Sequence, residues 1–558
     1  MARSNAGTAA RRPDKWGGMP TFAIDPVSVS GKSVPVAETT TVLVIGAGAA
    51  GCTAAIEGAQ RGLHVVLVDE NPIDFETMGN DVPLHFGGRM SGAARNRGAM
   101  TEAVVEANPL IAEAFEAGVD VRLSTSCWGL YLPAPGAQWP GRPVAGLADR
   151  DRCWQIGFEY VIVATGCRDL GIAFPGWESP GVMGARALQR LADSYGALDV
   201  ARAVVLGSGP EALSTIRALG RAGAECAAII ECADKLVAPA DEVARVTGES
   251  VRLLTGHVIA RAEADLDGVN AVVVTAIDAA GRHEPGTERT IECDTIVLSV
   301  APVPCIELLE ACGCRTRYDS ARGGHVPVLD GQQRSSLPKV FVVGDVAGVW
   351  PAKSSDESIG RSEARAAADS IAAALGAEGE SWSSRGGCAA PDPIVDLNSY
   401  LRRWVTASVL EANGSSFVCQ CEEVTARDIL DVRPPRYLAR EQATQKPSGL
   451  TAMLGNGPPS PDQVKRLTRA GMGTCQGRRC REQVAVLLAL ESGLTLGDVP
   501  LATYRAPVRP LTLAQLAETD EDPMMTLHWD RWFGIPAQFV PPWELKPDDH
   551  DGPGDAER

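Results

Sequence analysis

Four cysteines near the C-terminal end lie in two closely spaced pairs, which could bind a metal. Cys419 and Cys421 are separated by one residue in FVCQCEEVT, and Cys475 and Cys480 by four residues in GMGTCQGRRC. A zinc ribbon usually contains two similar C-x2-C pairs. One narrow and one wider pair suit the four thiolates that two irons share. The spacing therefore predicts a [2Fe–2S] cluster, with zinc as the alternative.

A glycine-rich turn lies near the other end of the chain, in TTVLVIGAGAAGCTAAIEG. It follows a β-branched run that predicts a buried strand, and it opens a helix of small residues. In a dinucleotide-binding turn the first glycine permits the bend, the second admits a pyrophosphate, and the third lets helix and strand pack closely. The helix N-terminus then attracts phosphate. The predicted turn comprises Gly46, Gly48, Ala49, Ala50 and Gly51.

Acidic residues accompany this turn. Asp69 ends the next predicted strand about 20 positions later, where a carboxylate can accept hydrogen bonds from a ribose diol. Glu70 is the alternative if the register shifts by one residue. Asp345 follows Gly344 at the end of the strand KVFVVGD. In two-domain flavoproteins an aspartate at this place accepts a hydrogen bond from a ribityl hydroxyl, and capping of the following helix is the alternative role.

A second glycine turn, GSGPEA, runs from Gly207 to Ala212 and keeps two of the three glycines. Glu231 ends the following strand, where it could contact a ribose. Glu211 places a carboxylate where a phosphate would approach, and it would repel that phosphate. Binding of NAD, of an adenine nucleotide only, or of nothing remains open for this turn. No C-x-x-C motif occurs, so a thioredoxin-reductase-like disulfide is not expected.

The two turns require two strand–helix–strand units, and the 558-residue chain is long enough for two to four domains. The net charge of −18 argues against non-specific nucleic-acid binding. No apolar run reaches the length of a membrane span, and no signal peptide follows the arginine pair near the start. We expect a cytoplasmic protein in which the fifteen cysteines stay reduced.

The order of these motifs resembles the flavoprotein alpha-type subunits of multi-subunit dye-linked amino-acid and amine dehydrogenases. That group includes opine oxidases, hydrogen cyanide synthase, and proline and hydroxyproline dehydrogenases. The resemblance covers roughly residues 41–520 and is most specific in FPGWESPGVM and in the cysteine segments, which are similar to bacterioferritin-associated ferredoxin. It is carried further by ATGC, GSGP and VFVVGD, in that order.

The resemblance implies an α/β fold with two Rossmann-like domains of the disulfide-reductase-like flavoprotein type and a small α-rich [2Fe–2S] domain. The expected divisions are an N-terminal extension, 1–40; an FAD-binding domain in two segments, 41–170 and 301–380; an inserted NAD-like domain, 171–300; a linker, 381–410; the [2Fe–2S] domain, 411–500, with an inserted loop, 434–462; and a tail, 501–558.

The resemblance also implies the ligands of the site. FAD would contact the first glycine turn, Asp69 or Glu70, Thr165, Gly166, Gly344 and Asp345, and the four cysteines would hold the cluster. The usual Gly-Gly-Gln-Ile-Tyr flavin loop is replaced by a longer segment, in which Gly88 and Arg89 are the candidates to take its place. FMN at a subunit interface, or a second adenine nucleotide, is a further cofactor option.

The expected function is an electron-transfer subunit of a hetero-oligomeric complex that oxidises a C–N bond of an amino acid or secondary amine. The flavin would take the two-electron step and the cluster the one-electron steps to an acceptor. The implied partners are an FAD-dependent beta subunit of the sarcosine or D-amino-acid oxidase type and a small ferredoxin-like subunit. Through them the protein could sit at the periphery of the inner membrane.

No catalytic residue is assigned, because the seven histidines are mostly isolated and no nucleophile triad or carboxylate pair occurs. Two other functions stay open. One is an NADH-dependent flavin and iron–sulfur reductase in which Glu231 holds the NADH ribose. The other is a non-catalytic, nucleotide-binding electron-relay subunit.

Overall fold

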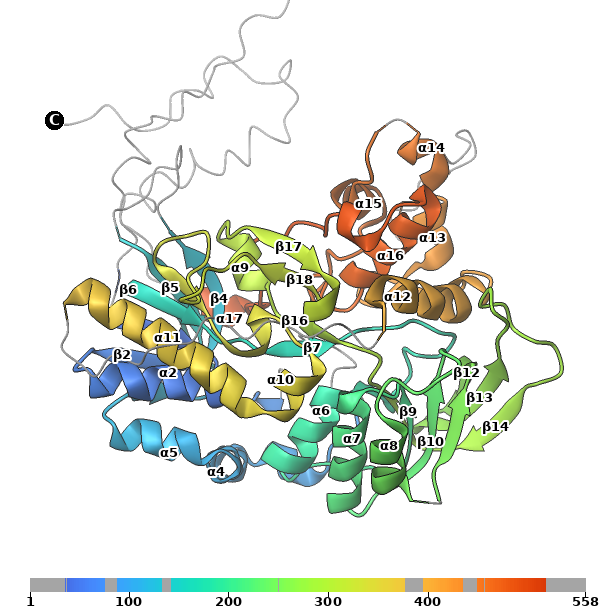
Figure 1. Ribbon diagram of the computed structural model, residues 1–558, viewed down its shortest axis with the longest axis horizontal. Coiled ribbons are helices and arrows are strands. Elements are labelled where there is room, and N and C mark those ends of the chain that lie inside the picture. The colour runs from blue at the N-terminus through green and yellow to red at the C-terminus, as the bar shows by residue number, and fades with distance from the viewer. Residues whose placement is uncertain are drawn as a thin grey trace, which may run out of the picture. The chain divides into compact units, whose positions relative to one another are not determined.

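The computed structural model describes residues 36, 38–75, 88–132, 142–248, 250–376, 395–434, 449–455 and 457–517. Almost all of these residues belong to one compact unit formed by 37–132 and 142–518. Within it, strand and helix segments alternate as the two βαβ patterns predict (Figure 1).

A seven-stranded sheet forms the first Rossmann-like domain. Its parallel part has the order β3-β2-β1-β6-β19, and an antiparallel meander, β6-β5-β4, extends it. The strands are β1 (Glu38–Ile45), β2 (Val65–Val68), β3 (Asp120–Arg122), β4 (Ser126–Tyr131), β5 (Val144–Ala148), β6 (Cys153–Val163) and β19 (Val340–Val342). The accompanying helices are α2 (Ala49–Gln60), α4 (Arg97–Ala107), α5 (Pro109–Glu116) and α11 (Glu357–Leu375).

A five-stranded parallel sheet of order β11-β10-β9-β15-β8 forms the second Rossmann-like domain. Its strands are β8 (Val182–Gly184), β9 (Arg202–Leu206), β10 (Glu225–Glu231), β11 (Arg252–Thr255) and β15 (Thr295–Leu298). Its helices are α6 (Ala185–Gln189), α7 (Pro210–Arg221) and α8 (Ala240–Thr247). An antiparallel sheet adjoins it, formed by β12 (His257–Asp265), β13 (Gly268–Ala276) and β14 (Arg289–Glu292).

The chain passes between the two domains through a short antiparallel ribbon, in which β7 (Cys167–Asp169) pairs with β16 (Pro302–Pro304). After β16 the chain returns to the first domain. The elements α9 (Glu307–Ala311), β17 (Thr316–Asp319) and β18 (Gly324–Pro327) precede β19, and α10 (Pro351–Ser355) follows it. The strand ends of both sheets therefore meet close to this ribbon.

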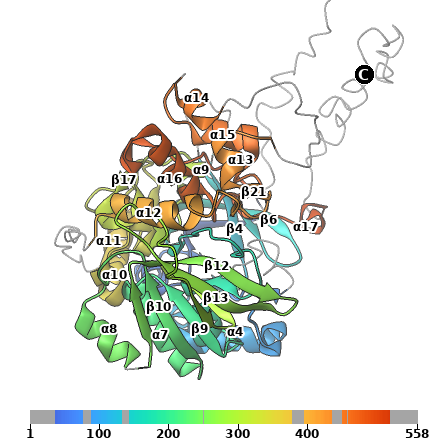
Figure 2. The same cartoon turned by 90° about the vertical axis from the view of Figure 1, so that its right-hand side faces the viewer.

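The C-terminal part is a helical unit that carries the cysteines (Figure 2). Its elements are α12 (Leu397–Val405), β20 (Phe417–Cys419), β21 (Val424–Thr425), α13 (Ala426–Leu430), α14 (Leu450–Leu454), α15 (Pro461–Thr468), α16 (Arg481–Ser492) and α17 (Leu513–Ala517). The predicted fold class, with two Rossmann-like domains and a small helical domain, is confirmed.

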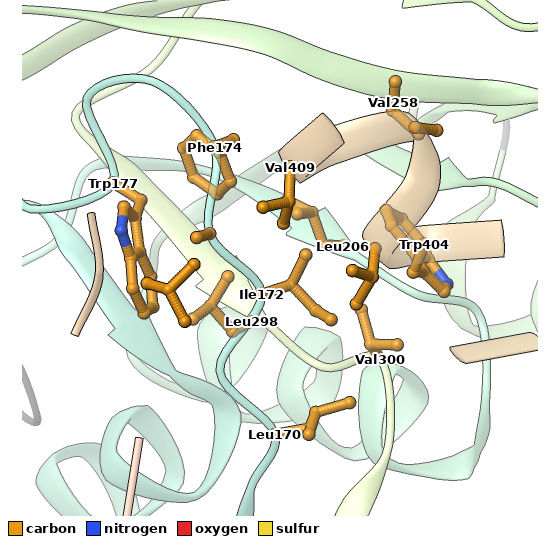
Figure 3. Close-up of a cluster of buried hydrophobic side chains, with 14 of the residues drawn as sticks. Leu170, Ile172, Phe174, Trp177, Leu206, Val258, Leu298, Val300, Trp404 and Val409 are labelled. Atoms are coloured by element: carbon orange, nitrogen blue, oxygen red, sulfur yellow. The ribbon is translucent and has the colours of Figure 1, made fainter. Parts of the chain in front are cut away.

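The helical unit shares its hydrophobic core with the second Rossmann-like domain. Side chains of the segment 170–177 pack between the strands of that domain and the segment 404–409 (Figure 3). Trp177 and Trp404 are both fully buried there. Burial of such large apolar side chains stabilises a domain contact strongly, so the cysteines are held in a defined place relative to both sheets.

Two predicted irregular segments contain helices. Residues 397–405 of the predicted linker form α12, because apolar residues recur at helical spacing and become buried. Within the predicted loop 434–462, Leu450 is buried in α14 and α15 begins at Pro461. The remaining predicted segments 1–35, 377–394, 435–448 and 518–558 lie outside the described residues.

Candidate functional site

The first glycine turn joins β1 to α2 and has the geometry of a phosphate-binding turn. A Cβ on Gly46 would lie 2.3 Å from the Ala164 carbonyl oxygen, and a Cβ on Gly51 would lie 1.8 Å from the Gly46 carbonyl oxygen. A Cβ on Gly48 would meet nothing within 4 Å. Two glycines are therefore required for packing, whereas Gly48 faces open space at the helix N-terminus, where a pyrophosphate could approach.

Asp69 directly follows β2, beside this turn. Its Oδ2 accepts a hydrogen bond from the Ala47 N–H at 2.6 Å, and its Oδ1 accepts from the Asn71 backbone and side-chain N–H groups, both at 2.8 Å. An ionised carboxylate offers about four acceptor sites. Asp69 therefore orders the turn and keeps the capacity to accept from a ribose hydroxyl.

A cavity of about 270 Å³ opens at this turn. Its walls contain seven of the predicted site residues: Gly46, Gly48, Asp69, Glu70, Thr165, Gly166 and Asp345. The cavity, the free helix N-terminus and the open face of Gly48 together fit the adenine-dinucleotide end of FAD.

Asp345 faces the same cavity from the end of β19. Its Oδ2 accepts a hydrogen bond from the Cys167 thiol at 3.3 Å and lies 3.5 Å from the Arg186 guanidinium. Gly344 beside it is held by a buried ion pair: Glu363 accepts from the Gly344 N–H at 2.8 Å, and Lys353 donates to the Gly344 carbonyl at 2.8 Å. The Gly344 N–H is therefore engaged by protein.

Four arginines line the same cavity. Arg186 and Arg190 come from the helix after β8, Arg478 from the cysteine segment, and Arg509 from the segment after it. Arg509 forms an ion pair with Glu70 at 2.7 Å. Burial lowers the pKa of the Arg478 guanidinium, and the charge of Arg509 lowers it further. This wall could stabilise negative charge on a ligand in the cavity.

An adjoining cavity continues this wall towards the cysteines. Asp169 and Arg479 line it, together with Arg478 and Arg186 from the first cavity. Burial raises the pKa of the Asp169 carboxyl to about 7, although its Oδ2 accepts a hydrogen bond from the Arg186 backbone N–H at 2.9 Å. The carboxyl therefore titrates near neutral pH beside the cavity.

The structure brings the four predicted cysteines together in two pairs. Cys419 and Cys480 contact each other, and so do Cys421 and Cys475. The Gly471 N–H donates to the Cys419 thiol at 3.4 Å, and a Cβ on Gly471 would lie 3.7 Å from the Cys480 thiol. These contacts place the first pair around one glycine.

The second pair lies around the next turn of the same segment. The Thr474 hydroxyl contacts the Cys421 thiol at 3.7 Å, and a Cβ on Gly473 would lie 2.4 Å from Cys421 Cβ. Hydrogen bonding by Cys475 lowers the pKa of the Cys421 thiol to about 6. Among the described residues, no three His, Cys, Asp or Glu side chains converge on a single metal position.

Several predicted site residues lie away from the cavity wall. Ala49, Ala50 and Gly51 belong to the first turn of α2 and do not line the cavity, although Gly51 packs on the turn. Arg89 donates to the carbonyl oxygens of Asp294 and Val269, in the second domain. Gly88 and Arg89 therefore do not line this cavity, and Gly88 lies nearest Pro180.

The second glycine turn has its acidic residue fully enclosed. Glu231 is 0% exposed and accepts from the Ser208 hydroxyl at 2.7 Å and from the Tyr400 hydroxyl at 3.0 Å. Burial raises the pKa of Glu231. Glu211 forms an ion pair with Arg186 at 2.8 Å. The Glu231 carboxylate is therefore occupied by protein hydroxyl groups, and the Glu211 carboxylate is paired with an arginine.

Sequence reasoning missed the residues that complete the cavity. They include Cys167, Arg186, Arg190, Cys305, Glu307, Arg478 and Arg509. The i, i+4 spacing of Arg186 and Arg190 could have indicated one helix face. Arg509 lies in a segment without periodicity, so its position depends on the tertiary fold alone.

Comparison with known proteins places the chain in a family. The pyridine nucleotide-disulphide oxidoreductase family matches residues 40–372, and the sarcosine oxidase A3 domain matches residues 451–520. An opine oxidase subunit from Agrobacterium tumefaciens (strain Ach5) is 28% identical over 500 residues, which cover 85% of this chain and 91% of that protein.

Two further relatives agree with this match. Hydrogen cyanide synthase subunit HcnB of Pseudomonas aeruginosa is 27% identical over 512 residues, covering 84% of this chain and 96% of that protein. The crystal structure of L-proline dehydrogenase from P. horikoshii has a TM-score of 0.56 and 20% identity, covering 86% of this chain and 80% of that one, which shows a common fold.

The resemblance to these alpha-type subunits is thus confirmed, and so is the prediction of an FAD-dependent oxidoreductase. The family match spans more than half of the chain and contains the whole glycine turn and the strand that ends at Asp345. The chain belongs to the pyridine nucleotide-disulphide oxidoreductase family.

Proposed function

We propose that this chain is the FAD- and [2Fe–2S]-containing electron-transfer subunit of a hetero-oligomeric complex that oxidises a C–N bond of an amino acid or secondary amine. The relatives at 28% and 27% identity are subunits of an opine oxidase and of hydrogen cyanide synthase. Their names describe one enzyme that oxidises opines and one that produces cyanide. They support the substrate class but do not select one substrate.

The observation that carries the proposal is that the segment containing Cys475 and Cys480 also lines the cofactor cavity. Arg478 and Arg479 line the cavities, and they lie in the chain directly between Cys475 and Cys480. A bound flavin accepts two electrons at once, and a two-iron cluster carries one. A wall formed by the cysteine segment itself supports transfer between the two sites within this one chain.

The four thiols lie close enough to one another to share one metal group. Cys419 contacts Cys480 and Cys421 contacts Cys475, and the pKa values of Cys475 and Cys480 are also raised by the charge of the other pair. The unequal spacing of the two cysteine pairs in the sequence suits a two-iron cluster, and zinc is the alternative. Each pair could serve one iron of a binuclear cluster. Arg479, which hydrogen-bonds Gln420 at 3.1 Å, adds positive charge beside it.

The residues of this chain would bind and orient the flavin rather than activate the amine. Gly48 admits the pyrophosphate, Asp69 accepts from the ribose, and Asp345 accepts from the ribityl chain. No histidine among the described residues lines either cavity. We therefore place the amine-binding site on a beta subunit of the sarcosine or D-amino-acid oxidase type, with a small ferredoxin-like subunit as a further partner.

Location remains a prediction. Among the helices that the structure describes, none combines the length and apolar character of a membrane span. We propose a cytoplasmic location, with contact to the inner membrane through the complex. FMN at the interface with the beta subunit remains an additional cofactor to be tested.

The test is to purify the chain anaerobically after co-expression with the products of neighbouring genes, and to record its visible spectrum. Flavin bands and broader iron–sulfur absorption, both bleached by dithionite, are expected. Amines and amino acids are then screened for bleaching of the flavin. A colourless protein that contains zinc would contradict the cluster assignment, and bound adenine nucleotide without flavin would favour the relay function.

Cysteine variants separate the cluster from ordinary thiols. Cys421→Ser and Cys480→Ser should each lower the bound iron by more than half, because every thiolate is a ligand. Cys312→Ser is the matched control, since Cys312 belongs to a second C-x-C pair whose thiols lie 3.9 Å apart. An equal loss of iron in all three variants would show that the assignment of ligands is wrong.

A further inference from the structure

Helix α12 packs on the second Rossmann-like domain through one apolar face. Its buried residues recur at helical spacing: Leu397, Tyr400, Leu401, Trp404 and Val405. In Figures 1 and 2, α12 lies between α16 and the strands of the second domain. The N-terminal half of this face lies over the second glycine turn, because Leu397 and Tyr400 line the hollow beside Gly209.

The side chain of Tyr400 reaches Glu231, the acidic residue that would hold a ribose. Its hydroxyl donates to Glu231 Oε2 at 3.0 Å, next to the Ser208 hydroxyl at 2.7 Å. The other oxygen, Oε1, accepts from the Ala233 N–H at 2.9 Å. A ribose diol binds such a carboxylate through hydroxyl groups. The phenol hydroxyl of Tyr400 thus takes the place of a ribose hydroxyl.

The phosphate end of the turn is unsuited to a dinucleotide as well. Pro210 is the first residue of α7, so one N–H that could donate to a phosphate is missing. Glu211 follows it with a carboxylate. No lysine or arginine among the described residues lines the hollow at this turn, and most of its wall is apolar. A pyrophosphate would therefore meet a carboxylate whose arginine partner, Arg186, is already held in an ion pair at 2.8 Å.

The contact of α12 is part of the core rather than a surface lid. Trp404 is fully buried in the cluster that includes Leu206 and Val300 of the second domain (Figure 3). Beside it, Arg403 forms an ion pair with Asp234 at 2.7 Å. Arg402 donates to the Leu494 carbonyl at 2.7 Å, which ties α12 to the end of α16. Displacing α12 would expose this shared core.

We infer that α12 occupies the nucleotide site of the second Rossmann-like domain, with Tyr400 in the position of the ribose, so that this domain does not bind NAD(H). Glu231 of this domain instead holds the cysteine-bearing unit in place through its hydrogen bond with Tyr400. The inference does not depend on amine oxidation, because it concerns only which nucleotide the chain can bind. If α12 fills this site, the alternative function as an NADH-dependent reductase has no binding site for NADH in this domain.

The test is titration of the FAD-loaded complex with ADP-ribose by calorimetry, so that the first site is already filled. Wild-type protein should show no saturable binding up to about 1 mM. Tyr400→Ala removes the phenol from Glu231 and leaves the phosphate end unchanged. Adenosine, which has no phosphate and should not bind wild type, should therefore bind this variant with a dissociation constant at least about tenfold below that limit. Adding Glu231→Gln to this variant should abolish the gained binding.

Leu401→Ala is the matched control. Leu401 is buried on the same face of α12, and it leaves the Tyr400–Glu231 hydrogen bond intact. It should loosen the helix without creating adenosine binding. Saturable binding to wild-type protein, bleaching of its flavin by NADH, or equal binding by Leu401→Ala and Tyr400→Ala would each overturn the inference. The wild-type titration needs no variant, so the inference stays testable if Tyr400→Ala fails to fold.

Discussion

At the residue scale, the glycines of one motif have different physical roles. Gly51 lies against the Gly46 carbonyl, and Gly48 faces open space with φ −70° and ψ 177°. The motif in the sequence predicts these separate roles. The distances agree with them, because a Cβ on Gly51 would overlap the turn and a Cβ on Gly48 would meet nothing within 4 Å.

This difference predicts opposite outcomes for two alanine variants. Gly51→Ala should destabilise the protein by about 3 kcal/mol or more, because its Cβ overlaps a backbone oxygen. Gly48→Ala should unfold within about 2 °C of wild type when FAD is absent, because its backbone suits alanine. It should nevertheless bind FAD at least about tenfold more weakly, since the methyl group occupies the pyrophosphate space.

Calorimetric unfolding and fluorescence titration with FAD measure the two effects separately. Gly92→Ala serves as a control, because a Cβ at Gly92 meets nothing within 4 Å and the residue does not line the cavity. Unchanged FAD affinity in Gly48→Ala would contradict the assignment of this turn to the pyrophosphate.

Asp169 provides a pH-dependent prediction. The pKa of its carboxyl is raised from 3.8 to about 7 by burial, among the charges of Arg186, Glu211 and Arg479. Between these values the folded protein holds one proton more than the unfolded chain, so its free energy of unfolding falls as pH rises. Asp169→Asn removes this proton but keeps an acceptor for the Arg186 N–H.

The variant should therefore gain stability relative to wild type as pH increases from about 5 to 8, by about 1 to 3 kcal/mol. Denaturant unfolding of both proteins at several pH values measures this difference. A stability difference that stays constant across the range would mean that Asp169 is ionised throughout.

At the element scale, a buried ion pair between α10 and α11 positions the strand end that carries Asp345. Lys353 and Glu363 lie 2.8 Å apart, with 1% and 11% of their side chains exposed, and they hold the Gly344 carbonyl and N–H groups. Neither residue touches the cavity wall. The pair thus fixes the peptide next to Asp345 without contacting a ligand.

Lys353→Met should destabilise the protein by about 3 to 5 kcal/mol, because it leaves Glu363 buried and unpaired. The double variant Lys353→Met/Glu363→Met should recover most of this stability, since apolar pairs often replace buried ion pairs without loss. It should still bind FAD about tenfold more weakly, because Gly344 loses both hydrogen-bond partners. Thermal unfolding and FAD titration distinguish these effects.

Arg361→Met is the control on the same helix. Arg361 pairs with Glu357 at the surface, where such pairs contribute less than about 1 kcal/mol. It should leave FAD affinity unchanged. If the double variant regains full FAD affinity together with its stability, the ion pair has only a structural role.

Sequence reasoning at this scale succeeded where strands and turns repeat a known pattern. The β-branched runs before Gly46 and Gly207 predict the strands β1 and β9, and the structure has both. It failed for α12, because the Pro-, Gly- and Ser-rich residues just before the helix indicate a linker. The spacing of Leu397, Tyr400 and Trp404 is visible in the sequence, but only the fold shows what that face covers.

At the scale of the whole molecule, the cysteine unit, the second domain and the cofactor cavity are connected through buried contacts. Trp177 donates from its indole N–H to the Phe417 carbonyl at 2.7 Å, and the Ala173 N–H donates to Gln483 at 2.8 Å. The sequence predicts that four cysteines gather, but their pairing depends on the path of the segment 471–475. The cavity wall formed by Arg478 and Arg509 likewise arises only when distant segments meet.

The central claim is that electrons from an amine reach a two-iron cluster in this chain. The most direct test is paramagnetic resonance of the anaerobic complex, frozen after addition of an amine that bleaches its flavin. The account predicts the signal of a reduced [2Fe–2S] cluster, with two irons per chain, and loss of that signal in Cys421→Ser. Bleaching without any such signal, or a signal that NADH produces and no amine does, would contradict it.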